Sequence, residues 1–497
     1  MSSTTAAVKV KVEAVDCFER DFTLRLPFRF GVITVTEGTQ AVVRATVALE
    51  DGRTAVGVAA ESLGAKWFDK SPAFSDAQNL DQLRQALGNA IALYRARGWS
   101  TSFGLYADTY GEQLARGGEL GLVPLVASYG PALLDRAVLD AVGRATGLSF
   151  AETIRRNVAG IEMREALTPD LAGFDVVGFL GALQPGRDIA VRHTVGLVDP
   201  IVAADQTPGE RVNDGLPETL EEVVRHYGTR YYKLKVGGDV AADLDRLQRI
   251  AAVLDRDAGD YLATLDGNEQ YDSVEGIAEL WRRMAERPAL AQLTKAILFI
   301  EQPIKRAKAL SAPVEPLARL KPLIIDESDG ELSSFPAALG LGYGGVSSKN
   351  CKGLYKSILN AARVAHLNAK VGAKAGTARY FMSAEDLTTL AGVSVQQDLA
   401  LVSLLGITHV ERNGHHFIDG MSFAPEVEQA VFAGAHPDLY ERSGGPARLR
   451  IDNGRLQLAS LGCPGFAVAA DMDFASLRPM AAPPTGRIAP AYPEKAA

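Results

Sequence analysis

The stretch Ala263-Thr-Leu-Asp-Gly-Asn268 decides the fold, because its pattern recurs along the chain. A short apolar run ends on Asp266, and a loop follows. Two further runs end on acids in the same way, Leu298-Phe-Ile-Glu301 and Leu323-Ile-Ile-Asp326. A strand that carries an ionisable side chain at its end, just before a loop, is typical of the catalytic face of a parallel barrel.

Working outward from this stretch, short β-like runs alternate with longer amphipathic stretches from about residue 188 onward. One such stretch follows Asp239, a candidate helix N-cap, with apolar residues on one helical face. Eight units in about 250 residues predict an α/β fold, a (β/α)8 barrel, and favour it over an open doubly wound sheet. The predicted strands are 189–196, 229–236, 261–265, 296–300, 323–325, 345–348, 370–373 and 408–410.

Outside this region, the predicted strands and helices no longer alternate in the same way. Over residues 1–150, β-like runs such as Gln40–Leu49 and Ala55–Glu61 give way to helical patterns, which predicts a separate α+β unit. We expect the barrel over 185–435 and a further segment over 436–497, with a Pro-rich tail of no regular structure. A loop rich in Pro, Gly, Asp and Asn over 199–218 is either a lid at the catalytic face or a surface insertion.

Composition excludes several classes of protein. The 497 residues carry a net charge of −8, which is not the footprint of a nucleic-acid binder. We find no apolar run of about 18 residues, as a membrane span would need, and no secretory signal pattern at the N-terminus. Three scattered cysteines argue against a disulfide framework. We therefore expect a cytoplasmic protein without nucleic-acid or membrane partners.

The three acids Asp266, Glu301 and Asp326 follow one another at intervals of 35 and 25 residues, about one βα unit each. Adjacent strands therefore bring them to one point. Carboxylates without His or Cys select Mg²⁺, with Mn²⁺ as a substitute. The alternative is that each acid caps the helix that follows it.

Three lysines flank this point. Lys233 and Lys235 lie two apart on one strand and face the same side. Their mutual repulsion, with that of a metal ion, is expected to lower the lysine pKa from about 10.4 toward the 7–8 range of a general base. Lys349, on the sixth strand, would approach a substrate from the opposite face. Alternatively, one or more of these lysines does no more than pair with the acids.

Together, Lys-x-Lys, Asp-x-Asn, Glu-Gln-Pro, Asp-Glu-Ser and the later strand-end lysine resemble the enolase superfamily, in its muconate-lactonizing and mandelate-racemase-like branch. The stretches Gly52–Glu61 and Asp135–Asp140 are similar to its N-terminal capping domain. The resemblance implies a modified (β/α)8 TIM barrel capped by the N-terminal α+β domain, which the C-terminal segment rejoins. It also implies Asp266, Glu301 and Asp326 as Mg²⁺ ligands, Lys235 and Lys349 as the acid/base pair, and Lys233 as the residue that tunes Lys235.

The sequence departs from the mandelate-racemase pattern, which places Asp on strand six and His on strand seven. Here those positions hold Lys349 and, by our alignment of the strands, Lys374. Candidate substrate contacts are Asn268, Lys374, Glu411, His415 and His416. A solvated loop lysine and structural histidines are the alternatives.

The predicted function is Mg²⁺-dependent abstraction of the α-proton of a small-molecule carboxylate, which forms a metal-stabilised enediolate. Racemisation or epimerisation, β-elimination (dehydration) and cycloisomerisation all remain open, so the enzyme is either an isomerase or a lyase. Alternatives are a metal-dependent barrel hydrolase and a non-catalytic binding member of the family. We expect a homo-oligomer.

Overall fold

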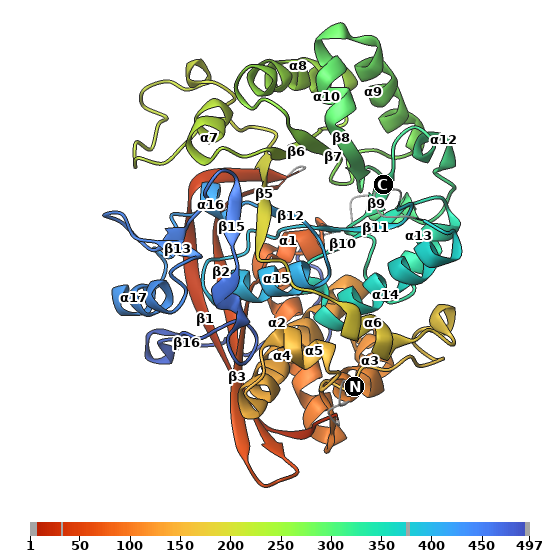
Figure 1. Ribbon diagram of the computed structural model, residues 1–497, viewed down its shortest axis with the longest axis vertical. Coiled ribbons are helices and arrows are strands. Elements are labelled where there is room, and N and C mark those ends of the chain that lie inside the picture. Colours follow the sequence, from red (N-terminus) through yellow and green to blue (C-terminus); the bar gives the residue numbers. More distant parts are fainter. Residues whose placement is uncertain (1–6, 31–32, 374–377, 493–497) are drawn as a thin grey trace.

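The computed structural model describes residues 7–30, 33–373 and 378–492. A closed parallel barrel and an N-terminal antiparallel sheet with its helices make up the molecule (Figure 1). No helix in these ranges is long and apolar enough to cross a membrane.

The N-terminal unit is built on a sheet with the order β16-β1-β2-β3, in which β16 (Arg478–Pro479) comes from the C-terminal segment. The turn at Asp51-Gly52, with Gly52 at φ 86°, joins the second and third strands. Its strands are β1 (Lys9–Phe30), β2 (Ile33–Leu49), β3 (Thr54–Ser62) and the short β4 (Ser100–Thr101). Its helices are α1 (Ala65–Phe68), α2 (Asp76–Arg97), α3 (Ser102–Glu119), α4 (Pro124–Thr146), α5 (Phe150–Arg155) and α6 (Val176–Ala182).

Helix α4 packs closely on β3 at Gly57. A Cβ atom at this position would stand 2.1 Å from the carbonyl oxygen of Ala137 and 2.3 Å from the amide nitrogen of Ala141. Glycine is therefore required for the sheet and the helix to approach this closely.

The barrel contains eight parallel strands in sequence order, and it closes because the last strand pairs with the first, at Val410↔Val191. The strands are β5 (Asp188–Val195), β6 (Tyr231–Lys235), β7 (Leu262–Asp266), β8 (Ile297–Glu301), β9 (Leu323–Ile325), β10 (Gly345–Ser348), β11 (Phe381–Ala384) and β12 (His409–Arg412). The surrounding helices are α7 (Leu220–Tyr227), α8 (Val240–Asp257), α9 (Val274–Glu286), α10 (Ala291–Ala296), α11 (Arg306–Ala309), α12 (Glu315–Ala318), α13 (Ser334–Gly340), α14 (Leu354–Lys370), α15 (Val393–Leu404), α16 (Gly414–Phe417) and α17 (Glu426–Ala435).

Seven of the eight predicted strands are confirmed to within a few residues. Helix α8 also begins as predicted, with the Asp239 side chain accepting hydrogen bonds from the Ala241 and Ala242 amides. The prediction of the seventh strand was wrong: residues 370–373 form the end of α14 and a turn, and the seventh strand of the barrel is β11. Helix α14 continues to Lys370, and Gly372, at φ 65°, follows its end. A local pattern could not distinguish that ending from a short strand.

The C-terminal segment reaches both parts of the molecule. After the hairpin of β13 (Tyr440–Glu441) and β14 (Arg448–Leu449), strand β15 (Arg455–Gln457) pairs with the start of β5, and β16 (Arg478–Pro479) pairs with β1. The Pro-rich tail then lies along the N-terminal unit, where the amide of Tyr492 donates a hydrogen bond to the Ala73 carbonyl.

Candidate active site

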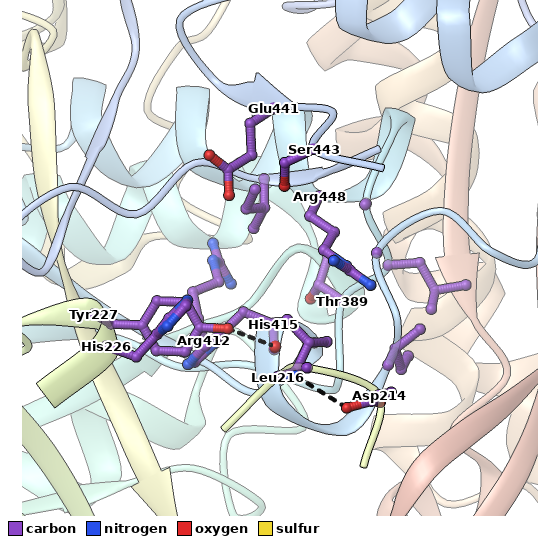
Figure 2. Close-up of a pocket in the computed structure, with 17 residues that line it drawn as sticks. Asp214, Leu216, His226, Tyr227, Thr389, Arg412, His415, Glu441, Ser443 and Arg448 are labelled. Carbon is purple, nitrogen blue, oxygen red and sulfur yellow. Dashed lines mark hydrogen bonds between the residues drawn. The ribbon is translucent and has the colours of Figure 1, made fainter. Parts of the chain in front are cut away.

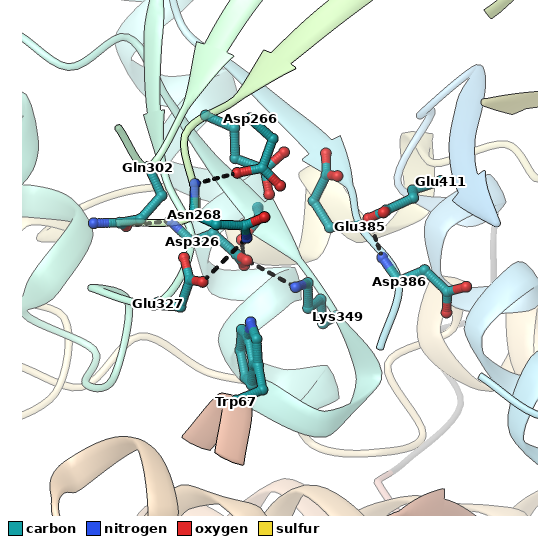
Figure 3. Close-up of polar contacts among 12 residues, drawn as sticks. Trp67, Asp266, Asn268, Gln302, Asp326, Glu327, Lys349, Glu385, Asp386 and Glu411 are labelled. Atoms are coloured by element: carbon teal, nitrogen blue, oxygen red, sulfur yellow. Dashed lines mark hydrogen bonds and ion pairs between the residues drawn. The ribbon is translucent and has the colours of Figure 1, made fainter. Parts of the chain in front are cut away.

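The ends of three neighbouring strands bring predicted site residues together. Lys235 is paired in register with Asp266, and Asp266 with Glu301. Residues paired in register on adjacent parallel strands project from the same face of the sheet, and these three stand at the carboxyl ends of their strands. Asp326 follows β9 directly and Lys349 follows β10, so both stand at the same mouth (Figure 3). The five side chains are at most 6% exposed.

Lys233 lies deeper, at the centre of a group of acids. Its ammonium nitrogen contacts four carboxylates, at 2.9 Å from Glu301, 2.8 Å from Glu385, 2.9 Å from Glu411 and 3.0 Å from Asp266. Burial by itself lowers the pKa of Lys233, but these carboxylates, Asp266 first, raise it well above its ordinary value. The expected lowering of the pKa at Lys233 was therefore wrong, because attraction to four anions outweighs repulsion from Lys235.

The other two lysines each hold one acid. Lys235 donates to Asp266 at 2.6 Å, and Lys349 donates to Asp326 at 2.7 Å. Burial opposes the charged form of Lys349, but Asp326 raises its pKa above the usual range. The two lysines thus contact two different acids of the mouth, on β7 and after β9.

Glu301 is the least compensated of the three predicted metal ligands. Burial, followed by repulsion from Asp266 and Glu385, raises its pKa well above the usual value. Its Oε2 atom lies 2.9 Å from the Lys233 nitrogen but accepts no hydrogen bond. The mouth therefore holds one carboxylate that burial and its neighbours push toward the neutral form.

Glu385 is a site residue that the sequence reasoning missed. It directly follows β11 and lies 2.8 Å from the Lys233 nitrogen, and it pairs with Arg192 inside the barrel. The signal was present, because Phe381-Met-Ser-Ala is a β-like run that ends on an acid. The misplaced seventh strand hid it and drew attention to Lys374, which lies outside the described residues.

Lys352 was missed as well. It lies three residues after Lys349, in the 3-10 helix Asn350–Lys352, and is buried. Its ammonium group lies 2.6 Å from the Ser347 hydroxyl, 3.0 Å from Asp329 and 3.5 Å from Asp326. Lys349 and Lys352 together lower the pKa of Asp326 below its usual range, against the effect of burial.

Two of the predicted substrate contacts lie at the mouth. Asn268 donates its amide N–H to Asp266 at 2.8 Å, and its side-chain Oδ1 is buried without a hydrogen-bond partner. Glu411 accepts hydrogen bonds from the Thr194 hydroxyl at 2.6 Å and from Lys233. Both belong to the group of polar side chains in Figure 3.

His415 and His416 contact a third histidine rather than the lysines and acids. His193 Nδ1 lies 3.2 Å from His415 Nε2, and the rings of His193 and His416 meet edge to face. On β5, His193 lies between Arg192 and Thr194, whose side chains contact acids inside the barrel, so His193 faces outward. The two histidines that contact it therefore lie on the outer side of the barrel wall. Burial lowers the pKa of all three histidines, which favours their neutral form.

The N-terminal unit covers the mouth through α1 and the residues after it. Arg306 donates to the carbonyl oxygens of Trp67 and Phe68, at 2.9 and 2.7 Å. Lys70 pairs with Glu269 at 2.5 Å and with Glu327 at 3.3 Å. These contacts hold the cover on the barrel.

The donor chemistry of Asp266, Glu301 and Asp326 fits Mg²⁺, because all three offer carboxylate oxygens and Glu301 Oε2 has no hydrogen bond. Across the described ranges, however, no three His, Cys, Asp or Glu side chains are arranged to hold an ion as they stand. An ammonium group lies against each of the three acids. Metal binding at this point therefore requires the lysines to give up part of these contacts.

No protein-family model and no curated relative matches the chain. Several solved structures match the chain. A muconate lactonizing enzyme from Mycobacterium smegmatis matches at 18% identity, over 94% of this chain and 98% of the other, with a TM-score of 0.58. A dipeptide epimerase from Enterococcus faecalis, complexed with Mg and a dipeptide, matches at 14% identity, over 92% and 99%, with a TM-score of 0.57. An enolase from Bradyrhizobium, complexed with magnesium and mandelic acid, matches at 17% identity, over 93% of this chain and 96% of the other, with a TM-score of 0.55.

These likenesses extend over nearly the whole of both chains, and at such identities what they show is the fold. The closed barrel with its separate N-terminal antiparallel sheet is the architecture of those structures. These comparisons therefore show that the chain has the fold of those enzymes.

Proposed function

We propose that the protein is a Mg²⁺-dependent enzyme that removes the proton next to the carboxylate group of a small-molecule substrate. The observation that carries the proposal is the position of two lysines around one group of buried acids. Lys235 contacts Asp266 and Lys349 contacts Asp326, so two amines flank the acids from strands β6 and β10.

In this proposal Asp266, Glu301 and Asp326 would hold the ion, and Mn²⁺ would serve as a substitute for Mg²⁺. When bound, the ion supplies stabilisation of the negative charge that develops on the substrate carboxylate. Lys235 accepts the proton from the substrate carbon. Lys349, whose contact with Asp326 favours its charged form, delivers a proton from the other side.

Lys233 acts on the acids in this scheme. Its contacts with Glu301, Glu385 and Glu411 fix the carboxylates beneath the reaction centre and balance their charge. Asn268 and Glu411 are proposed to contact substrate. Proton return makes the enzyme a racemase or epimerase, loss of a β-substituent makes it a lyase, and ring opening or closure makes it a cycloisomerase.

Isotope exchange tests the first step without knowledge of the whole reaction. The protein is incubated in D₂O with Mg²⁺ and each member of a carboxylate panel, and α-deuterium uptake is followed by NMR. We expect uptake into at least one compound, and K235A to reduce its rate about 10²–10⁴-fold, the usual share of a general base.

Lys295, an exposed lysine of α10, provides the matched control, and K295A is expected to exchange at the wild-type rate. Circular dichroism checks that both variants fold. Exchange in K235A at the wild-type rate would show that Lys235 is not the base, and absence of exchange from the whole panel would count against the proposed function.

A further inference from the structure

A cavity lies on the outer side of the barrel wall, away from the lysines and acids. Its volume is about 240 Å³, and its walls come from the loop after β5, the end of α7, α16 and the β13–β14 hairpin (Figure 2). Arg412 lines it and pairs with Asp398 of α15, whereas its neighbour Glu411 points into the barrel. The cavity and the mouth therefore lie on opposite faces of β12.

Two opposite charges face this cavity from one hairpin. Glu441 and Arg448 are direct cross-strand partners, and both line the cavity. Side chains in such positions start about 5 Å apart and, with opposite charges, normally attract one another. Here Arg448 donates to Asp419 at 2.6 Å instead, and Glu441 makes no ion pair with any residue in the described ranges.

The remaining charges of the cavity have partners. Asp214 pairs with Arg25 at 2.5 Å, and Arg412 pairs with Asp398. Among the described residues, the Glu441 carboxylate is therefore the acidic side chain of the lining that has no ion-pair partner. Arg448 uses Nε and Nη2 on Asp419, and a guanidinium carries five N–H donors, so it retains donors for an anionic group.

We propose that this cavity binds a free α-amino acid, with its ammonium group at Glu441 and its carboxylate at Arg448. The two groups of an amino acid are separated by a single carbon, which matches an acid and a base side by side on one hairpin. A volume of about 240 Å³ has room for the backbone and a modest side chain of an amino acid. Tyr227 and Leu216 provide apolar surface for that side chain.

The loop over 199–218 contributes to this site. Asp214–Leu216 form part of the wall, and Glu218 holds the loop by accepting hydrogen bonds from the Val212 and Asn213 amides at 3.1 and 2.9 Å. The proposal does not depend on the reaction at the barrel mouth.

The test uses the full-length protein and the twenty common L-amino acids, each at millimolar concentration, screened by thermal shift and then measured by isothermal titration calorimetry. We expect saturable binding of at least one. We expect E441Q and R448M each to weaken it about tenfold or more, because each removes a charge-assisted contact. The N-acetyl and methyl ester derivatives of the same amino acid should bind correspondingly weakly.

E426Q is the matched control, since Glu426 pairs with Arg442 of the same hairpin and does not line the cavity. It should bind like the wild type, and so should K235A. The proposal is overturned if no amino acid binds saturably, if E441Q binds as well as the wild type, or if K235A alone abolishes binding, which would place the ligand at the barrel mouth.

Discussion

The ammonium nitrogen of Lys349 lies 4.2 Å from the centre of the Trp67 indole ring. Lys349 follows strand β10 of the barrel, and Trp67 comes from α1 of the N-terminal unit, so this contact joins the two parts at the mouth (Figure 3). A cation over an indole face is stabilised by about 0.5–2 kcal/mol, depending on its desolvation. Lys349 is 4% exposed, which favours the upper part of that range.

Replacement of Trp67 should therefore impair proton delivery by Lys349. Because the indole face positions the Lys349 ammonium group, we expect W67L to slow turnover about two- to thirtyfold, the fold-change that corresponds to about 0.5–2 kcal/mol of lost positioning, while W67F retains most of the rate. Turnover is measured on a substrate identified by isotope exchange. Equal rates for W67L and the wild type would show that the indole does not act on Lys349.

Lys233 should be essential to stability. K233M leaves four carboxylates without their shared cation, and removing one partner of a buried charge group costs about 3–5 kcal/mol of the free energy of unfolding. Because the folded pKa of Lys233 is raised, its contribution is fully present below the unfolded value of about 10.4 and is lost only above it. Urea unfolding at pH 7 measures the loss, and K295M, at an exposed site, is the control. A K233M variant as stable as the wild type would contradict this role.

The three buried histidines should make the protein less stable in mild acid. Burial lowers the folded pKa of His193, His415 and His416, while the unfolded chain takes up protons at these residues below pH about 6.5. The free energy of unfolding should therefore fall as pH drops below that value, by up to about 1.4 kcal/mol per histidine and pH unit. Unfolding at pH 7.5 and 5.5 tests this, and H416F should reduce the slope. An unchanged slope in H416F would exclude His416 as a source.

Gly57 should not tolerate a side chain. G57A places a methyl group against the α4 backbone at Ala137 and Ala141, and overpacking of this kind costs about 1–3 kcal/mol. Gly88, inside α2, has no atom within 4 Å of an added Cβ, so G88A should stabilise the protein by about 0.5–1 kcal/mol. Thermal unfolding measures the stability of both variants relative to the wild type. A G57A variant as stable as the wild type would show that α4 can shift away from β3.

Removal of divalent metal should abolish exchange activity, and Mg²⁺ or Mn²⁺ should restore it. D326N should weaken Mg²⁺ binding, measured by calorimetry independently of activity, because it removes one anionic ligand. Binding in D326N as tight as in the wild type would exclude Asp326 from the metal site.

Most of the barrel and most of the candidate site could be predicted from local sequence patterns. Apolar runs of strand length, each ending on Lys, Asp or Glu at intervals of about one βα unit, are sufficient to place Lys235, Asp266, Glu301, Asp326 and Lys349 at one mouth. Alternation along a strand and repetition of a unit are properties of neighbouring residues, so the sequence displays them directly.

Contacts between distant segments decided the rest. The pKa of Lys233 rises because acids 33 to 178 residues away in the chain surround it. The sequence analysis missed Glu385 because the end of α14 resembled a strand. His415 and His416 lie in α16 and contact His193 on the outer side of the barrel wall. Composition and spacing thus determined which chemical groups meet at the barrel mouth. Folding in three dimensions decided their charge states and what covers them, because both depend on the distances between groups that the chain itself keeps far apart.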